Sequence, residues 1–510
     1  MTQMGFGNGH PGRYFFQIDE EVWPGACIEK DLDPNLPDRL PLTFFPRYGH
    51  MLGGTLVNIT GPCLNPNSII VCKFENWKVE GYYRDPNHAT CISPPVMYHG
   101  YIDLTVSVDD KTLFLGRYYL QPPEVADEAV VVLNDKDREE WPLELPFKWQ
   151  PEKLAWDLRA PITVSLWGYR ETNDLYPSLT YIDTLADGIQ LGQREHILSL
   201  DTFQDRWNGG LHDITFGYIA INLTNPKVVG DKVKTSPTIW SRTMPLSWYF
   251  KRQWERVYGD WKRHFCYNWY DRESFADRFA TTNFKCPCTR QQALLDKGRF
   301  SPDLECNIID RKCDTFHRGA LDCFRSGRPS IGGSGQKCCY DDWHELIQTA
   351  DTMYGGRPSR AFIYGKHPYK MRMMIPALSN WLHDEMPFFF CCKWQENEDN
   401  ADTCQAYNYW RTSQDCSSYQ APAIGSVYGD PHFLTFDGSN YTFNGRGEFT
   451  LVHTDTAVHK FDVQARFEQV QIIFLSRALS HPERERDSLL SLSLWREAPF
   501  SLFDSFTQEN

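Results

Sequence analysis

The first part of the chain alternates between apolar and polar residues over short runs, the pattern of half-buried β-strands. Such runs cover residues 55–60, 69–74 and 101–108, with turn-forming residues between them. About 80 residues with this spacing are typical of a small β-sandwich. We therefore predict an immunoglobulin-like β-domain over residues 41–121.

Further apolar runs predict strands at residues 130–133, 162–167 and 213–223. We assign the last two to a second β-domain over residues 141–240, and the first to a short strand within an acidic linker. At the other end of the chain, residues 1–40 hold a candidate strand at 12–18 followed by a proline-rich run. This composition predicts the tail of a preceding domain and a linker. The predicted fold class is mostly β and multidomain.

Beyond Pro245 the apolar period changes to three and four residues, which is typical of an amphipathic helix. The recurring side chains are Trp254, Val257, Trp261, Phe265 and Trp269. We interpret this aromatic stripe as a core-facing surface in preference to a ligand-binding box. Farther on, residues 289–292 fit a capping box, and Gly298 is placed to end a short helix.

Twelve of the sixteen cysteines lie in one block that begins within this stripe: Cys266, Cys286, Cys288, Cys306, Cys313, Cys323, Cys338, Cys339, Cys391, Cys392, Cys404 and Cys416. A zinc site needs paired Cys-x2-Cys or Cys/His spacings, whereas this block has Cys-x-Cys and Cys-Cys. Disulfides are therefore favoured over zinc, and they indicate an oxidising compartment. Three glycosylation sequons, at Asn58, Asn222 and Asn440, agree with that location.

Composition and charge exclude several classes of protein. The chain is 41% hydrophobic and 23% charged, which is typical of folded domains. A net charge of -14 makes nucleic acid and anionic membrane surfaces poor partners. No run reaches the roughly 18 apolar residues that span a bilayer, and the first residues lack a signal peptide. We expect a fragment of a longer secretory protein, with a cytosolic protein as the alternative.

The sequence offers little catalytic chemistry, and we predict that the chain is not an enzyme. The run Trp343-His344-Glu345 lacks the second histidine of a helical zinc protease motif and is interpreted as a helix surface. The run Gly332 to Gly335 is not a nucleophile elbow. The run His383 to Glu385 is interpreted as a solvated turn in preference to a metal site.

One bond has a plausible cleavage mechanism. The carboxylate of Asp430 can attack its own carbonyl carbon, because the nitrogen of Pro431 is a better leaving group than an ordinary amide. His432 is placed to assist proton transfer. A strand-entry turn with no cleavage is the favoured alternative.

Asp437, Ser439, Asn440 and Asn444 carry side-chain oxygens that are candidate donors to calcium. A β-turn is the favoured interpretation of these residues.

Motifs in three regions resemble known domain families. Residues 41–121 resemble an IPT/TIG immunoglobulin-like domain through Phe45-Pro46-Arg47-Tyr48-Gly49, Gly53-Gly54-Thr55 and Ser93-Pro94-Pro95. That resemblance implies a bridge between Cys72 and Cys91. Residues 245–418, the aromatic helix and cysteine block, resemble an AMOP domain, a disulfide-rich α+β module of adhesion proteins. The matching residues include Cys286-Pro287-Cys288-Thr289, Gly298-Arg299-Phe300, Asp303 and Gln336-Lys337-Cys338-Cys339-Tyr340.

Residues 427–471 resemble the start of a von Willebrand factor type D domain. The motifs are Gly429-Asp430-Pro431-His432, Phe436-Asp437-Gly438 and Tyr441-x-Phe443-x-Gly445, with Gly447 where many members have cysteine. In some mucin members the first motif is a self-cleavage sequence, so the resemblance implies the same candidate bond here. Residues 472–510 match nothing and are left unassigned.

This domain order resembles that of the Mesh-type proteins of septate junctions. The resemblance implies a non-enzymatic adhesion protein at the extracellular face of the plasma membrane, in contact with other extracellular or junctional membrane proteins. Membrane attachment would use segments absent from this chain. A secreted mucin-like or matrix protein with type D self-cleavage is the alternative.

Overall fold

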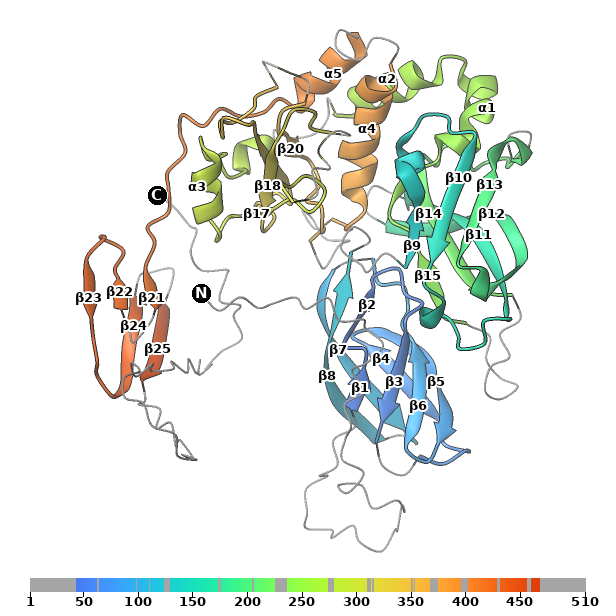
Figure 1. The fold of residues 1–510 in the computed structure, drawn as a ribbon, viewed down its shortest axis with the longest axis horizontal. Coiled ribbons are helices and arrows are strands. Elements are labelled where there is room, and N and C mark those ends of the chain that lie inside the picture. Colours follow the sequence, from blue (N-terminus) through green and yellow to red (C-terminus); the bar gives the residue numbers. More distant parts are fainter. Residues whose placement is uncertain are drawn as a thin grey trace, which may run out of the picture. The chain divides into compact units, whose positions relative to one another are not determined.

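The computed structural model describes residues 43–467, with gaps at 62–63, 98, 110, 123–128, 173–175, 204–205, 225–235, 274–278, 310–312, 314–315, 350–351, 353, 367–374, 396–401, 429–431 and 456–459. The candidate strand at 12–18, the proline-rich linker that follows it and residues 472–510 lie outside this part of the chain. Figure 1 shows the helices and strands of the chain. The chain divides into two compact units. One runs to His264 and includes Ile363–Met386, and the other contains Phe265–Phe362 and the chain from Pro387.

The first β-domain is built from eight strands that pair in the order β1-β3-β6-β5-β4-β7-β8-β2. Their bounds are β1 Thr43–Phe45, β2 Tyr48–His50, β3 Leu56–Thr60, β4 Ile70–Phe74, β5 Trp77–Asp85, β6 His88–Ile92, β7 Gly100–Val108 and β8 Lys111–Gln121. Alternate side chains of β7 face the core, among them Ile102 and Leu104, while Tyr101 faces solvent. A disulfide joins Cys72 on β4 to Cys91 on β6 inside this core.

The second β-domain contains two sheets. One has the order β13-β10-β9, and the other has β12-β11-β14-β15 with β16 paired to β14. The bounds are β9 Val130–Val132, β10 Glu144–Trp149, β11 Pro161–Thr172, β12 Tyr176–Gln190, β13 Glu195–Ser199, β14 Phe216–Leu223, β15 Thr238–Trp240 and β16 Met244–Pro245. Short helical turns lie between them, η2 Leu133–Arg138, η3 Pro151–Lys153, η4 Leu191–Gln193 and η5 Leu200–Thr202. Because β9 pairs with β10, the strand placed in the acidic linker belongs to this domain.

The two β-domains are in direct contact within their compact unit. The indole N–H of Trp240 donates to the carbonyl of Gly53 at 3.0 Å, and the amide of Thr238 donates to the carbonyl of Gly54 at 3.0 Å. Gly54 has φ +87°, and a Cβ there would lie 2.5 Å from the carbonyl oxygen of Thr238. A side chain at this position is excluded, so the close approach of the two domains depends on glycine.

The predicted aromatic helix is two helices, α1 Ser247–Tyr258 and α2 Trp261–Glu273. Gly259, at φ +68°, ends the first, because glycine adopts this conformation without a Cβ penalty. The single-helix prediction was wrong here, although the stripe is buried at Trp254, Trp261 and Trp269 as expected. Helix α1 packs on the second β-domain, where the Trp254 indole donates to the His212 carbonyl at 2.7 Å.

The cysteine block forms an α+β module around the sheet β17-β18-β19-β20. Its elements are α3 Arg290–Leu295, β17 Phe300–Pro302, β18 Asp322–Ser326, β19 Gly335–Tyr340, β20 Pro358–Ser359, α5 Asp402–Trp410 and the short turn η6 Phe279–Thr282. Thr289 and Gln292 form the capping box of α3. Farther along the chain, α4 Met386–Phe388 lies between two π-helical turns, η7 Trp381–Glu385 and η8 Phe389–Lys393.

The last described segment consists of small sheets. Strands β21 Ser426–Tyr428, β22 His432–Leu434 and β23 Asn440–Thr442 form one, and β24 Gly447–Asp455 pairs with β25 Lys460–Phe467 in the other. Phe433, Ala465 and Phe467 are buried together between them. The predicted fold class, a mostly β chain with immunoglobulin-like domains, a disulfide-rich α+β module and a partial type D segment, is confirmed.

Candidate functional site

Seven disulfides connect the described cysteines. They are Cys72–Cys91, Cys266–Cys391, Cys286–Cys338, Cys288–Cys416, Cys306–Cys313, Cys323–Cys339 and Cys392–Cys404. Each adjacent pair of cysteines binds two separate partners, so β19 is joined to both Cys286 and Cys323. Two bridges close segments of 125 and 128 residues and tie the ends of the module together.

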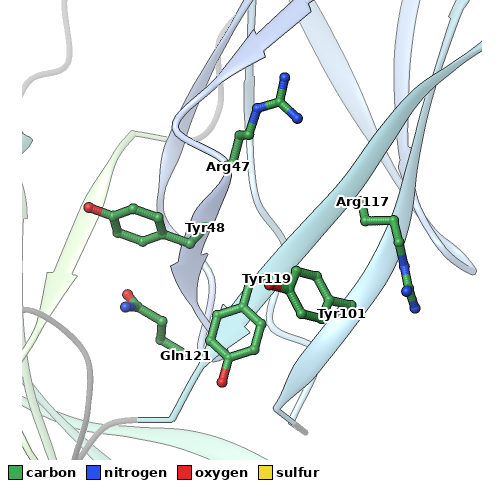
Figure 2. A pocket seen from close by; sticks show the side chains of 6 residues that line it. All are labelled: Arg47, Tyr48, Tyr101, Arg117, Tyr119 and Gln121. Carbon is green, nitrogen blue, oxygen red and sulfur yellow. The ribbon is translucent and has the colours of Figure 1, made fainter. Parts of the chain in front are cut away.

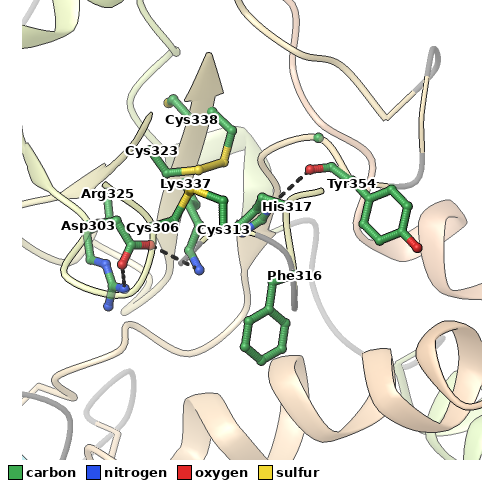
Figure 3. Close-up of a disulfide and its surroundings, with 12 residues drawn as sticks. Asp303, Cys306, Cys313, Phe316, His317, Cys323, Arg325, Lys337, Cys338 and Tyr354 are labelled. Atoms are coloured by element: carbon green, nitrogen blue, oxygen red, sulfur yellow. Dashed lines mark hydrogen bonds and ion pairs between the residues drawn. A yellow bond between two sulfur atoms is a disulfide. The ribbon is translucent and has the colours of Figure 1, made fainter. Parts of the chain in front are cut away.

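Three side chains lie as close together as metal ligands do, but two of them are joined by a disulfide and cannot bind a metal as thiolates. The ligand atoms of His317, Cys323 and Cys339 lie within 4.8 Å of one another, and the three residues are buried. Figure 3 shows His317 and Cys323. The two sulfurs are bonded to each other, so neither offers the thiolate that zinc requires. Burial, with Lys337 and Arg357 nearby, holds the pKa of His317 well below its ordinary value. The ring is therefore neutral, and its Nδ1 lies 2.9 Å from the carbonyl oxygen of Tyr354.

A buried ion cluster supports the same sheet. Asp303 has no exposed surface; its carboxylate accepts from the Arg325 guanidinium and lies 3.2 Å from the Lys337 ammonium (Figure 3). Its other contact is the amide of Glu305, at 2.9 Å. Burial disfavours the charged carboxylate, but Arg325 and Lys337 outweigh it and hold the pKa of Asp303 well below its usual range. The ionised form is thus part of the folded state.

This lowered pKa predicts how the stability of the module depends on pH. A depressed carboxyl pKa stabilises the fold above the ordinary value of 3.8, and that contribution is lost as the pH falls below it. We expect Asp303→Asn to lower the free energy of unfolding by about 3 kcal/mol at neutral pH. The difference in free energy of unfolding between variant and wild type, measured by denaturant titration, should shrink as the pH falls below 3.8. Exposed Asp342→Asn is the control, and a pH-independent gap would contradict the account.

A second buried ion pair joins α2 to the C-terminal end of α5. Glu273 is 1% exposed and Arg411 is fully buried, and their Oε2 and Nη2 atoms lie 3.0 Å apart. The guanidinium of Arg411 also lies 5.0 Å from the ring centroids of Trp269 and Phe279. Arg360, on the more exposed side, contacts Glu273 Oε1 at 2.7 Å. The charges of Glu273 and Arg411 are thus paired, and aromatic rings pack against the guanidinium.

The predicted glycosylation sites differ in accessibility. Asn58 on β3 and Asn440 on β23 are exposed, while Asn222 on β14 is half-buried. The amide of Asn222 donates to the Leu223 carbonyl at 3.3 Å. Glycosylation at these positions stays a prediction.

The candidate cleavage bond lies outside the described residues, because Gly429, Asp430 and Pro431 fall in a gap. His432 is described at the start of β22. Its Nδ1 lies 2.8 Å from the Thr442 hydroxyl of β23. The histidine is thus held to the neighbouring strand, and its proposed role in proton transfer stays a prediction.

Among the candidate calcium donors, Asp437 lies in a turn and Ser439 closely follows it. The carboxylate of Asp437 accepts from the hydroxyl of Thr435 and from the amide of Ser439, and these bonds lower the pKa of Asp437. Gly438, at φ +84°, supplies the turn conformation. An aspartate that accepts hydrogen bonds from residues of its own turn is typical of a β-turn, so the carboxylate of Asp437 acts as the turn interpretation predicts. Asn440 begins β23 and Asn444 follows that strand, and both are exposed.

Two interpretations of polar runs were wrong. The run His383 to Glu385 is a π-helical turn with Asp384 buried, bonded to the Asn380 amide at 3.2 Å, and is therefore no solvated turn. The run from Trp343 is a turn and no helix, because the Asp341 carboxylate accepts from the amides of Trp343 and Glu345. Side-chain bonds of this kind compete with helix formation.

Glu171 on β11 links that strand to the helical turn at residue 383. Its buried carboxylate accepts from the hydroxyls of Tyr169 and Ser379 and lies 3.4 Å from His383 Nε2. Burial disfavours its charge, but His383 and the hydroxyls hold the pKa of Glu171 below its ordinary value. In a nucleophilic triad the histidine stands between hydroxyl and acid. Here the carboxylate of Glu171 lies between the hydroxyl of Ser379 and the ring of His383. This order is not that of a triad, so the histidine does not activate the hydroxyl of Ser379.

The first β-domain has a surface hollow that the sequence did not predict. It measures about 530 Å³ and is lined by Arg47, Tyr48, Tyr101, Arg117, Tyr119 and Gln121 (Figure 2). We call this surface the tyrosine–arginine hollow. Its residues come from β2, β7, β8 and the residue just before β2. Only the strand register brings them together, and no local pattern in the sequence predicts this surface.

Three domain families match the chain. Residues 42–120 match the IPT/TIG domain, residues 261–420 the AMOP domain, and residues 425–471 the von Willebrand factor type D domain. These are non-catalytic modules of the adhesion type. They define the chain as a disulfide-bonded, multidomain protein of AMOP and type D architecture.

The chain is a homologue of mesh. It is 42% identical to "Protein mesh" of Bombyx mori over 92% of its own length and 29% of that protein. It is 30% identical to human "Sushi domain-containing protein 2" over 83% of its length and 52% of that relative. A shorter match, 28% identical over 40% of the chain and 3% of the relative, is to human "Mucin-4". The chain thus spans less than a third of mesh and about half of the sushi-domain relative.

Proposed function

We propose that the chain is part of an extracellular cell-adhesion protein that organises epithelial septate junctions through protein–protein contacts. The observation that carries this proposal is the 42% identity with mesh across 92% of the chain. Seven disulfides support an extracellular location, because such bonds form and persist in oxidising compartments.

The proposed location is the extracellular face of the plasma membrane at cell junctions. Among the described residues, no helix is long and apolar enough to cross a bilayer. Attachment would use segments of a longer protein, as in the Mesh-type architecture. The proposed partners are other extracellular or junctional membrane proteins, which suits a chain of net charge -14 better than nucleic acid.

Localisation in the epithelium tests this function. A fluorescent tag at the chromosomal locus should concentrate at lateral cell–cell borders, at the depth of the septate junctions. The same tag behind a signal peptide alone is the control for secretion. Uniform cytoplasmic signal, or signal spread evenly through the extracellular space, would contradict the proposal.

A secreted mucin-like or matrix protein with type D self-cleavage is the second candidate. The match to Mucin-4 over 40% of the chain favours it. In this case purified protein held at mildly acidic pH should split into two fragments at Asp430. The Pro431→Ala variant, which replaces the better leaving group with an ordinary amide, should stay whole. A single intact species in both samples would exclude cleavage.

A further inference from the structure

Three tyrosines form a row across adjacent strands of the first β-domain. In the strand register, Tyr101 of β7 lies opposite Tyr119 of β8, and Tyr119 lies opposite Tyr48 of β2. The rings of Tyr101 and Tyr119 are 4.9 Å apart between centroids and tilted by 56°, and Figure 2 shows them side by side. Tyr101 is 61% exposed and Tyr48 is 40% exposed. Large aromatic rings open to solvent are enriched at protein-binding surfaces.

Two arginines flank this row without carboxylate partners among the residues that the structure describes. The guanidinium of Arg117 lies 5.2 Å from the ring centroid of Tyr101, and that of Arg47 lies 5.5 Å from the ring centroid of Phe44. Asp103 stands opposite Arg117 in the register but forms no ion pair with it. Both arginines are exposed. In a chain of net charge -14, this hollow therefore offers a local site for anions.

The other polar groups of the hollow are neutral. Burial and the neighbouring Tyr101 raise the pKa of Tyr119, so its hydroxyl remains protonated. Gln121, next to Tyr119 in Figure 2, adds an amide with two donors and one acceptor. Hydroxyl and amide donors can bond the free backbone carbonyls of an extended peptide.

We propose that the tyrosine–arginine hollow binds an extended, acidic, proline-containing segment of a partner protein. Such segments adopt the polyproline II conformation, whose rings pack against aromatic side chains and whose carbonyls are free to accept hydrogen bonds. Carboxylates of the segment bind Arg47 and Arg117 through charge-assisted hydrogen bonds. This inference rests on the proposed adhesive function and names the chemistry of its partner.

Fluorescence polarisation with a labelled peptide of alternating glutamate and proline tests the inference on the full chain. The wild type should bind it, and a peptide of alternating lysine and proline should not bind. Arg47→Gln with Arg117→Gln should weaken binding at least tenfold, since each lost charge-assisted bond accounts for roughly a tenfold change. Arg84→Gln removes an exposed arginine elsewhere in the same domain and is the matched control. Equal melting temperatures would show that all variants fold.

Several results would overturn the inference. These are equal binding of the acidic and basic peptides, undiminished binding by the double arginine variant, or no binding by wild type at about 1 mM peptide. A sulfated oligosaccharide that binds through the same arginines, when the acidic peptide does not, would replace the peptide with a glycan. If the peptide fails while the tagged protein still gathers at cell borders, this inference is wrong and the adhesive function stands.

Discussion

Replacing Arg411 by methionine is expected to lower the free energy of unfolding of the AMOP module by about 3–5 kcal/mol. The substitution removes the fully buried guanidinium that faces Glu273, itself 1% exposed. A buried carboxylate that loses its partner keeps its desolvation cost without the compensating attraction. Packing on Trp269 and Phe279 is only partly replaced by the methionine chain. Denaturant titration of the disulfide-intact protein measures the effect.

Two further variants separate charge from packing. Arg360→Gln also removes a contact to Glu273, but this arginine is 36% exposed. Solvent screens its charge and Arg411 still pairs the carboxylate, so we expect a smaller loss, about 1 kcal/mol. Adding Glu273→Leu to Arg411→Met removes both buried charges and should recover a large part of the lost stability. If Arg360→Gln destabilises as much as Arg411→Met, burial is not the source of the effect.

Removing the Cys266–Cys391 bridge is expected to destabilise the module more than removing Cys306–Cys313. The first bridge closes a segment of 125 residues and the second only 7. By loop-closure entropy the two contribute about 5 and about 2.5 kcal/mol, and other bridges inside the long segment reduce the first figure. The double serine variants, compared by denaturant titration, measure the difference.

The short-loop variant is the internal control, because both substitutions remove two buried cysteines. The Cys288–Cys416 pair, with a separation of 128 residues, should behave like Cys266–Cys391. A larger loss for Cys306→Ser with Cys313→Ser than for either long-range pair would show that local packing outweighs chain entropy.

Local structure was largely predictable from the sequence. Alternating runs gave the strands β3, β4 and β7 to within a residue or two, because one face of each is buried. The capping box at Thr289 formed as expected, since its two bonds involve only residues three apart. The break at Gly259 was missed because the aromatic spacing continues across it, from Trp254 to Trp261.

Long-range features were not predictable in the same way. Adjacent cysteines such as Cys338 and Cys339 do not encode which distant partner each one binds. The buried pairing of Glu273 with Arg411, 138 residues apart, has no local signature. The tyrosine–arginine hollow depends on the parallel pairing of β2 with β8, which a two-to-three-residue strand pattern does not reveal. Buried charge, bridge partners and this surface all required the fold.

These features fit the proposed role of an extracellular adhesion protein. Disulfides and buried ion pairs stabilise the AMOP module, and a glycine at position 54 permits close contact between the two β-domains. The proposed binding chemistry lies on the first β-domain, in the tyrosine–arginine hollow. In this proposal, recognition resides in the first β-domain and the stabilising bridges and ion pairs reside in the AMOP module.

Retention of coated beads on living epithelial cells tests the adhesive function most directly. Beads carrying the purified chain are allowed to settle on a monolayer, and the fraction that resists a fixed shear flow is measured. We expect retention well above that of albumin-coated beads, and its loss after the chain is reduced and alkylated. Retention no greater than that of albumin, with the disulfides intact, would contradict an adhesive role.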